Sequence, residues 1–294
     1  MTSPPAALQT LTSQRPFRLY GSAVGDVLIY FHGAPGAPEE ASLFDAAAKA
    51  HGLRVLVIDR FAAPLALKGE AYFQWLAAQI QQFTKDDKLV LVGFSIGAFV
   101  ALRTCRHLGG RVEELHLISA AAPLDGGDFL ASMAGKAVFR LARAAPRLFL
   151  LLSGWQGLLA RFAPHALFKL LFASARGSDA GLAGEVEFQA TLGAILRTCF
   201  VGNLRGYVRD VDAYVQPWNW VLGEIQVPVF LWHGAQDNWS PPGMASHLRN
   251  ALSQCISVQM MEGQSHYGCL LKAAPLICAT SAERSTRLLQ TGRS

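Results

Sequence analysis

Charged residues are scarce in this sequence, and its cysteines show no pairing pattern. Only 16% of the 294 residues are Asp, Glu, Lys or Arg, whereas 51% are hydrophobic. A disordered protein needs the opposite balance, so the composition excludes that class and allows a large core. The five cysteines are odd in number and include no CxxC pair, which argues against a secreted disulfide framework.

The sequence also has no long apolar run and no basic leader. Its longest apolar run, residues 148–160, is interrupted by polar residues and is shorter than the roughly 20 residues of a membrane-spanning helix. The first ten residues contain no basic segment followed by an apolar one, so we expect no signal peptide and a cytoplasmic protein. The net charge of +5 is far below a nucleic-acid-binding composition, and we expect no nucleic-acid partner.

Short apolar segments rich in β-branched residues alternate with segments of helical period. The expected strands are 27–31, 54–59, 88–94, 115–119, 229–232 and 257–261, with 17–24 as an antiparallel edge strand. The expected helices are 39–50, 70–83, 97–108 and 242–252. Apolar strands that alternate with helices are typical of a parallel sheet buried on both faces. The predicted fold class is therefore α/β, with helices on both faces of a mostly parallel central sheet.

This alternation stops in the middle of the chain. Residues 123–226 show only helical patterns broken by Gly and Pro, and the strand pattern then resumes. We interpret the segment as an all-helical cap or lid inserted after the sixth strand, with residues 1–122 and 227–294 forming the core. Such a cap would cover the carboxyl ends of the strands, where ligands of open α/β sheets bind. The alternative is a small helical domain that has no part in the chemistry.

A Gly-x-Ser-x-Gly motif lies at the corner between the expected strand 88–94 and the helix after it. Its residues are Gly93, Ser95 and Gly97. In a nucleophile elbow the turn is so tight that only small residues fit two positions before and after the serine, whose hydroxyl is left exposed. The pattern by itself arises by chance, and the alternative is a serine in an ordinary turn. Its position at a strand–helix junction favours the elbow.

A serine nucleophile needs a base and an acid that orients the base. Asp237 follows the expected strand 229–232, and His266 follows the strand 257–261, so both are expected in loops at the same edge of the sheet as Ser95. Alternatively, Asp237 caps the helix that starts near Pro241, and His266 is an ordinary surface histidine. Asp125, after the strand 115–119, is the alternative acid.

Acyl transfer also needs hydrogen-bond donors that stabilise the developing oxyanion. One expected donor is the backbone N–H of Ile96, which starts the helix after Ser95. The second is the N–H of Ala34, in the Gly- and Pro-rich loop that begins with His32 and Gly33 after the strand 27–31.

Together these motifs resemble the α/β-hydrolase superfamily, in particular a member with a serine nucleophile and a helical cap. The resemblance extends from about residue 17 to 289 and implies the triad Ser95, Asp237 and His266. Many capped members have Asp-Arg-Pro-Gly-x-Gly-x-Ser after a strand, whereas this chain keeps only Asp59 and Arg60, which leaves the subfamily open. A serine nucleophile disfavours haloalkane dehalogenase and epoxide hydrolase chemistry, which in this family uses an aspartate.

The activity that we predict is hydrolysis of a carboxylic ester with an apolar acyl or alcohol part through an acyl-enzyme. The expected partner is a lipophilic small molecule, and no cofactor or metal is expected because no ligand spacing is present. A C–C bond hydrolase or a thioesterase would use the same triad. A non-catalytic ligand-binding protein and an interfacial lipase remain open as further alternatives, and sequence sets no oligomeric state.

The basic residues are concentrated in one part of the predicted cap. Between residues 129 and 178 there is no Asp or Glu, and there are seven basic residues: Lys136, Arg140, Arg143, Arg147, Arg161, Lys169 and Arg176. The rest of the chain is therefore slightly acidic. One interpretation is a solvated basic face, and the other is weak contact of an amphipathic lid with an anionic membrane surface.

Overall fold

The computed structural model describes residues 17–291, with side chains described as far as residue 284. Residues 1–10, on which the signal-peptide expectation rests, lie outside this range. Within it, no helix is both long and apolar enough to cross a membrane.

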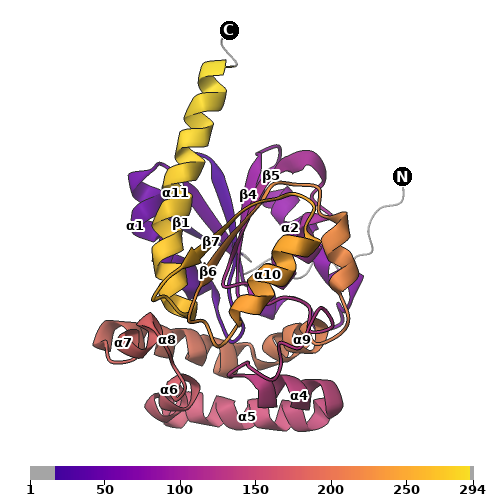
Figure 1. Cartoon of the computed structure of the whole chain (residues 1–294), viewed down its shortest axis with the longest axis vertical. Coiled ribbons are helices and arrows are strands. Elements are labelled where there is room, and N and C mark those ends of the chain that lie inside the picture. The colour runs from indigo at the N-terminus through magenta and orange to yellow at the C-terminus, as the bar shows by residue number, and fades with distance from the viewer. Residues whose placement is uncertain (1–16, 292–294) are drawn as a thin grey trace.

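A seven-stranded sheet forms the centre of the molecule (Figure 1). Its order is β1-β3-β2-β4-β5-β6-β7, in which β1 is an antiparallel edge strand beside β3 and every other pair of neighbours is parallel. The mostly parallel sheet and the antiparallel edge are thus confirmed. The strands are β1 (Phe17–Gly21), β2 (Val27–Phe31), β3 (Arg54–Ile58), β4 (Leu89–Phe94), β5 (Val112–Ile118), β6 (Val229–Gly234) and β7 (Cys255–Met261).

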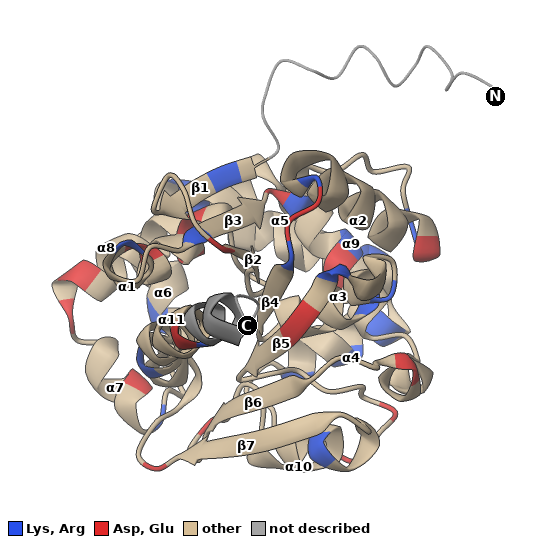
Figure 2. Cartoon of the chain, turned by 90° about the horizontal axis from the view of Figure 1, so that it is seen from above, with Lys and Arg blue, Asp and Glu red and all other residues tan. Residues whose placement is uncertain are grey.

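Helices cover both faces of the sheet, which explains why β2 and β4 are buried along their whole length (Figure 2). On one face lie α1 (Asp45–Ala50) and α11 (His266–Thr291). On the other lie α2 (Glu70–Thr84), α3 (Ile96–Cys105) and α10 (Pro242–Ala251). Three short 3₁₀ helices connect these elements: η2 (Pro38–Phe44), η3 (Arg60–Ala62) and η4 (Gly109–Arg111). The predicted helix 39–50 is therefore two elements, η2 and α1.

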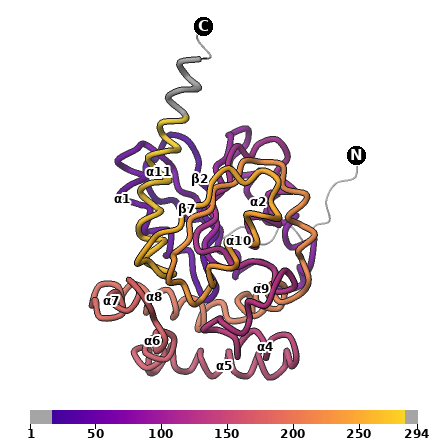
Figure 3. Tube along the Cα trace, viewed as in Figure 1, coloured from indigo at the N-terminus to yellow at the C-terminus, as the bar shows by residue number. Residues whose placement is uncertain are grey.

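All the regular elements between β5 and β6 are helical, and they gather at one end of the sheet (Figure 3). We call the segment from residue 123 to residue 226 the helical insertion. Its elements are α4 (Lys136–Ala144), α5 (Pro146–Phe162), α6 (Pro164–Phe172), α7 (Ser178–Leu182), α8 (Val186–Arg197), η5 (Thr198–Gly202), α9 (Leu204–Tyr214) and η6 (Asn219–Glu224). The prediction placed it after the sixth strand, but only five strands precede it in the described chain.

Helix α11 was not predicted, and its first residue is His266, for which a loop was expected. The reason is a contact between distant parts of the chain. The buried carboxylate of Asp179 in α7 accepts hydrogen bonds from the backbone N–H groups of Tyr267 (3.1 Å) and Gly268 (2.8 Å). These are orphan donors of the first turn of α11, so the helix is capped by a residue of the insertion.

Candidate active site

Ser95 lies in a strained turn between β4 and α3. Its backbone φ of +55° is in the left-handed region that non-glycine residues rarely adopt. A Cβ at position 93 would lie 2.6 Å from Ala98 Cα, and one at position 97 would lie 2.1 Å from the carbonyl oxygen of Phe31. Both positions therefore require glycine, and the Gly-x-Ser-x-Gly motif has the geometry of a nucleophile elbow.

Asp237 and His266 form a buried hydrogen-bonded pair. His266 Nδ1 lies 2.8 Å from Asp237 Oδ2, and Asp237 Oδ1 accepts hydrogen bonds from the N–H groups of Trp239 (2.8 Å) and Ser240 (2.9 Å). Both carboxylate oxygens are therefore occupied. Asp237 does not cap α10, because the residue at the N-cap of that helix is Pro241.

The pair shifts the protonation equilibria of both groups. Burial alone would lower the pKa of His266, but the Asp237 carboxylate, together with the charges of Asp179 and Glu40, raises that pKa above its ordinary value. Burial likewise opposes the charged form of Asp237, but His266 and the backbone donors hold its pKa below the ordinary value. This arrangement favours an ionised Asp237 that stabilises the imidazolium form of His266.

Aromatic rings fix the imidazole beside the elbow. The ring of Trp239 stacks on His266 with centroids 5.5 Å apart, and the ring of Phe94, the residue before Ser95, lies 4.7 Å from it. Among the described residues no hydrogen bond joins the Ser95 hydroxyl to His266. Such bonds are often long in unliganded sites and tighten when substrate binds.

The residues of the predicted oxyanion hole share one cavity with Ser95. Its volume is about 70 Å³, and it is lined by residues of the core and of the helical insertion. In the described chain the N–H of Ala34 donates no hydrogen bond, and the N–H of Ile96 is at the start of α3, where no intrahelical acceptor exists. The lining residues are Ala34, Pro35, Ser95, Ile96, Ala121, Met133, Gly135, Val138, Phe139, Gln156, Leu171, Tyr207, Trp239 and Ser240.

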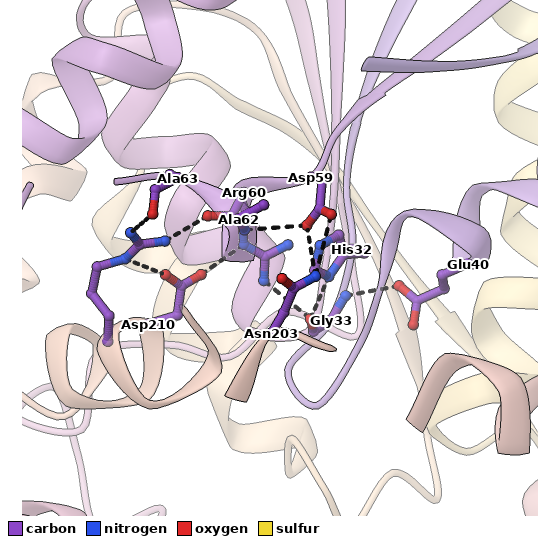
Figure 4. A network of polar contacts seen from close by, with 10 residues as sticks. His32, Gly33, Glu40, Asp59, Arg60, Ala62, Ala63, Asn203 and Asp210 are labelled. Atoms are coloured by element: carbon purple, nitrogen blue, oxygen red, sulfur yellow. Dashed lines mark hydrogen bonds and ion pairs between the residues drawn. The ribbon is translucent and has the colours of Figure 1, made fainter. Parts of the chain in front are cut away.

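A buried network holds the loop that contains Ala34 (Figure 4). The N–H of Gly33 donates to Glu40 Oε2 (2.7 Å), which also accepts a hydrogen bond from the Tyr30 hydroxyl (2.8 Å). On the other side, Arg60 Nη2 donates to the carbonyl oxygen of Gly33 (3.0 Å). Burial raises the pKa of Glu40 to about 7. The peptide groups just before Ala34 are thus fixed by side chains on both sides.

The same network ties the helical insertion to the core. Arg60 Nε lies 2.7 Å from Asp210 Oδ2, and both side chains are fully buried. Arg209, beside Asp210 in α9, donates to the carbonyl oxygens of Arg60 (2.5 Å) and Ala63 (3.2 Å). A Cβ at Gly206 would lie 2.0 Å from the carbonyl oxygen of Phe61, so glycine allows α9 to approach η3 this closely.

Sequence reasoning missed Glu40, Asp179 and Asp210. Asp179 could have been noticed as the first acidic residue after the acid-free segment 129–178. Asp59 and Arg60 were recognised only as the remnant of a family motif. Asp59 accepts hydrogen bonds from Ala62 N–H and the Asn203 amide, whereas Arg60 forms the ion pair with Asp210. No local signal shows that Glu40 or Asp210 is buried.

Two other residues named from the sequence have different surroundings. His32 is buried against Phe61 with ring centroids 4.7 Å apart, and burial lowers its pKa, so the ring is neutral. Asp125, named as the alternative acid, is exposed and interacts electrostatically with His247, whereas the carboxylate hydrogen-bonded to His266 is that of Asp237. Among the described residues, no group of three His, Cys, Asp or Glu side chains is placed to hold a metal ion.

Comparison with known proteins gives a family and a fold. The model of one family, the alpha/beta hydrolase fold, matches residues 26–273. No curated protein matches the sequence.

Several solved structures share the fold at low sequence identity. A bromoperoxidase from Bacillus anthracis has 15% identity and a TM-score of 0.63, with 93% of each chain covered. An esterase from Exiguobacterium antarcticum has 18% identity and a TM-score of 0.61, covering 91% of this chain and 94% of its own. An enol-lactonase from Burkholderia xenovorans LB400 has 17% identity and a TM-score of 0.61, covering 92% of this chain and 95% of its own. Because the family match extends over most of the 294 residues, the chain belongs to the alpha/beta hydrolase fold family.

Proposed function

We propose that the protein is a serine hydrolase that cleaves carboxylic esters through an acyl-enzyme. The observation that carries the proposal is the 2.8 Å hydrogen bond between Asp237 and His266, next to the elbow of Ser95. A carboxylate, an imidazole and a hydroxyl in this order are the parts of a catalytic triad. The esterase and the enol-lactonase that share the fold are consistent with hydrolase chemistry.

In the proposed mechanism, Nε2 of His266 takes the proton of the Ser95 hydroxyl as Oγ attacks the ester carbonyl carbon. The carbonyl oxygen becomes an oxyanion, which accepts hydrogen bonds from the N–H groups of Ala34 and Ile96. When the tetrahedral intermediate collapses, His266 returns the proton to the leaving alcohol. Water then attacks the acyl-Ser95 ester with His266 again as the base, and the carboxylic acid is released. Asp237 keeps Nδ1 protonated and stabilises the imidazolium.

The cavity indicates the kind of ester. Most of its lining is apolar, and the helical insertion supplies Val138, Phe139 and Leu171. A cavity of about 70 Å³ is smaller than the typical ligand pocket of roughly 300–1,000 Å³. Gln156 is one of the polar residues of the lining, and its side-chain oxygen is buried with no hydrogen-bond partner among the described residues. We therefore propose an ester with a short apolar acyl or alcohol part. We also propose that the substrate carries a hydrogen-bond donor that binds the side-chain oxygen of Gln156.

Replacement of the nucleophile tests the proposal. We expect Ser95→Ala to abolish hydrolysis of p-nitrophenyl butyrate and labelling by a fluorophosphonate probe, with the circular dichroism spectrum unchanged. Ser132→Ala, which alters an exposed serine outside the cavity, is the matched control and should behave as the parent. Full turnover by Ser95→Ala would refute the assignment.

Parallel substrates separate the ester hydrolase from enzymes that use the same triad. An ester, a thioester and a vinylogous diketone of similar size should be compared by kcat/KM. We expect the ester to have the highest value. A parent protein that neither turns over any substrate nor reacts with the fluorophosphonate would instead be a non-catalytic binding protein.

A further inference from the structure

Helix α5 presents a continuous apolar stripe to solvent. The stripe consists of Leu148, Leu151, Trp155, Leu158 and Phe162, each between 48% and 74% exposed. Their spacing alternates between three and four residues, which places them within an arc of about 80° on the helix. Large side chains aligned in this way are not the isolated exposed hydrophobics of an ordinary surface.

The opposite side of α5 faces the interior, so the stripe is a second apolar face and not part of the core. Phe149, Ser153, Gln156 and Ala160 are buried there. Helix α5 lies at the outer end of the molecule, on the far side of the insertion from the sheet (Figure 1). The helix spans about 25 Å at 1.5 Å per residue, and the stripe extends along nearly all of it.

Positive charge surrounds the stripe. Arg147 and Arg161 lie on α5 itself, and the basic residues of α4 and α6 are exposed on the helices that pack against it. From residue 129 to 178 the chain has seven basic residues and no acidic one. Among the described residues, none of these seven forms a salt bridge. Their charge is available to an external partner.

The positive charge around the apolar stripe decides which kind of partner fits it. A second copy of this chain docked symmetrically through α5 would bring the same seven positive charges against each other. A neutral apolar partner would leave that charge unused. An anionic lipid surface satisfies both features, because it takes apolar side chains below the headgroups and attracts basic residues at their level.

We propose that the α5 stripe is a docking surface for anionic lipid membranes, with α5 lying in the plane of the interface. The position of α5 also suggests how substrate reaches the cavity. Gln156 on its inner side lines the cavity with Ser95, so the same helix separates the bilayer from the proposed site. The docked enzyme would receive lipophilic esters from the membrane.

Co-sedimentation with vesicles is the direct test. We expect the full chain to pellet with vesicles of phosphatidylcholine and phosphatidylglycerol at low salt, and to pellet less with pure phosphatidylcholine or at high salt. Leu151→Gln/Leu158→Gln/Phe162→Gln should reduce the partition coefficient at least about tenfold. Leu19→Gln/Ile256→Gln/Leu276→Gln is the matched control, since it alters exposed apolar residues on β1, β7 and α11, and it should bind as the parent does.

The charge is tested separately. Arg147→Gln/Arg161→Gln should weaken binding to anionic vesicles and flatten its salt dependence. Lys68→Gln/Lys85→Gln removes the same charge from two exposed positions that flank α2, and it should leave binding unchanged. Brominated lipids should quench fluorescence of the parent, and Trp155→Phe should remove most of that quenching if the stripe enters the bilayer.

Ser95→Ala should bind vesicles as the parent does, so a failure of the proposed catalysis can be told from a failure of docking. No binding to anionic vesicles at low salt would overturn the proposal, as would full binding by the triple α5 variant. A dimer that forms only when the stripe is intact, without vesicle binding, would also overturn it and assign the stripe to a second copy.

Discussion

At the residue scale, the contacts of His266 determine both the pKa of its ring and the ring nitrogen that carries the proton. In the proposed mechanism the ring must be neutral to take the Ser95 proton, and Asp237 raises the pKa of the ring. An aspartate in this position also determines which ring nitrogen carries the proton, because Asp237 accepts from Nδ1 and leaves Nε2 for the substrate side. Both effects are measurable in the pH dependence of turnover.

We expect kcat/KM for an ester to rise with pH and to level off, with the midpoint of the acid limb above about 6.5, the ordinary value for histidine. The direction follows because protonation removes the base, and a raised pKa extends the protonated range upward. Asp237→Asn should move the midpoint down and lower kcat by about 10²–10⁴. Stopped-time assays between pH 5 and 9 would show this. A profile identical in parent and variant would mean that Asp237 does not act on His266.

The sequence predicted this site as far as local patterns allow. Ser95 was found from its two glycines, and Asp237 and His266 from their positions after strands, because parallel strands bring such positions to one edge. Glu40 and Asp210 could not be found in this way. Each is an ordinary acidic residue on a helical segment, and only the folded arrangement shows that its partners, Gly33 and Arg60, are buried with it.

At the scale of elements, the strands of the sheet were the easiest to predict. Each inner strand is buried on both faces, so its residues form a short apolar run that polar residues end. Helix α11 was missed because its first turn depends on Asp179, 88 residues earlier than Tyr267 in the chain. When the capping residue belongs to a distant element, the sequence around the helix start contains no capping signal.

We expect Asp179→Ala to lower the free energy of unfolding by about 1–2 kcal/mol, as the loss of a helix cap does. Because the first residue of α11 is His266, kcat should fall more than KM changes. Asp179→Asn keeps one acceptor oxygen and should restore part of both quantities. Urea denaturation and ester kinetics on the same preparations provide the two measurements, and an alanine variant with parental kcat would show that this cap does not position His266.

At the scale of the whole molecule, the question is how the helical insertion is held on the sheet. The buried ion pair between Arg60 and Asp210 joins η3 to α9, and Arg60 also binds the carbonyl oxygen of Gly33. A movement of α9 would therefore also displace the loop that contains Ala34. Asp59 and Arg60 both contact the insertion, since Asp59 accepts a hydrogen bond from the Asn203 amide and Arg60 forms the ion pair with Asp210.

A double-mutant cycle tests this connection. Arg60→Met leaves Asp210 only its longer contact with Arg209 (3.4 Å), and Asp210→Leu leaves the buried Arg60 without its carboxylate. Each should lower the free energy of unfolding by about 3–5 kcal/mol. Arg60→Met/Asp210→Leu removes the 2.7 Å pair, and Arg209 keeps its hydrogen bonds to the backbone carbonyl oxygens of residues 60 and 63, so the loss of stability should be well below the sum of the two. Ester turnover gives a second readout, because the double variant regains packing but not the hydrogen bond from Arg60 to Gly33. We therefore expect its stability to recover more than its kcat. Additive losses of stability would show that the pair is not coupled, and full recovery of kcat would show that Arg60 does not position the loop.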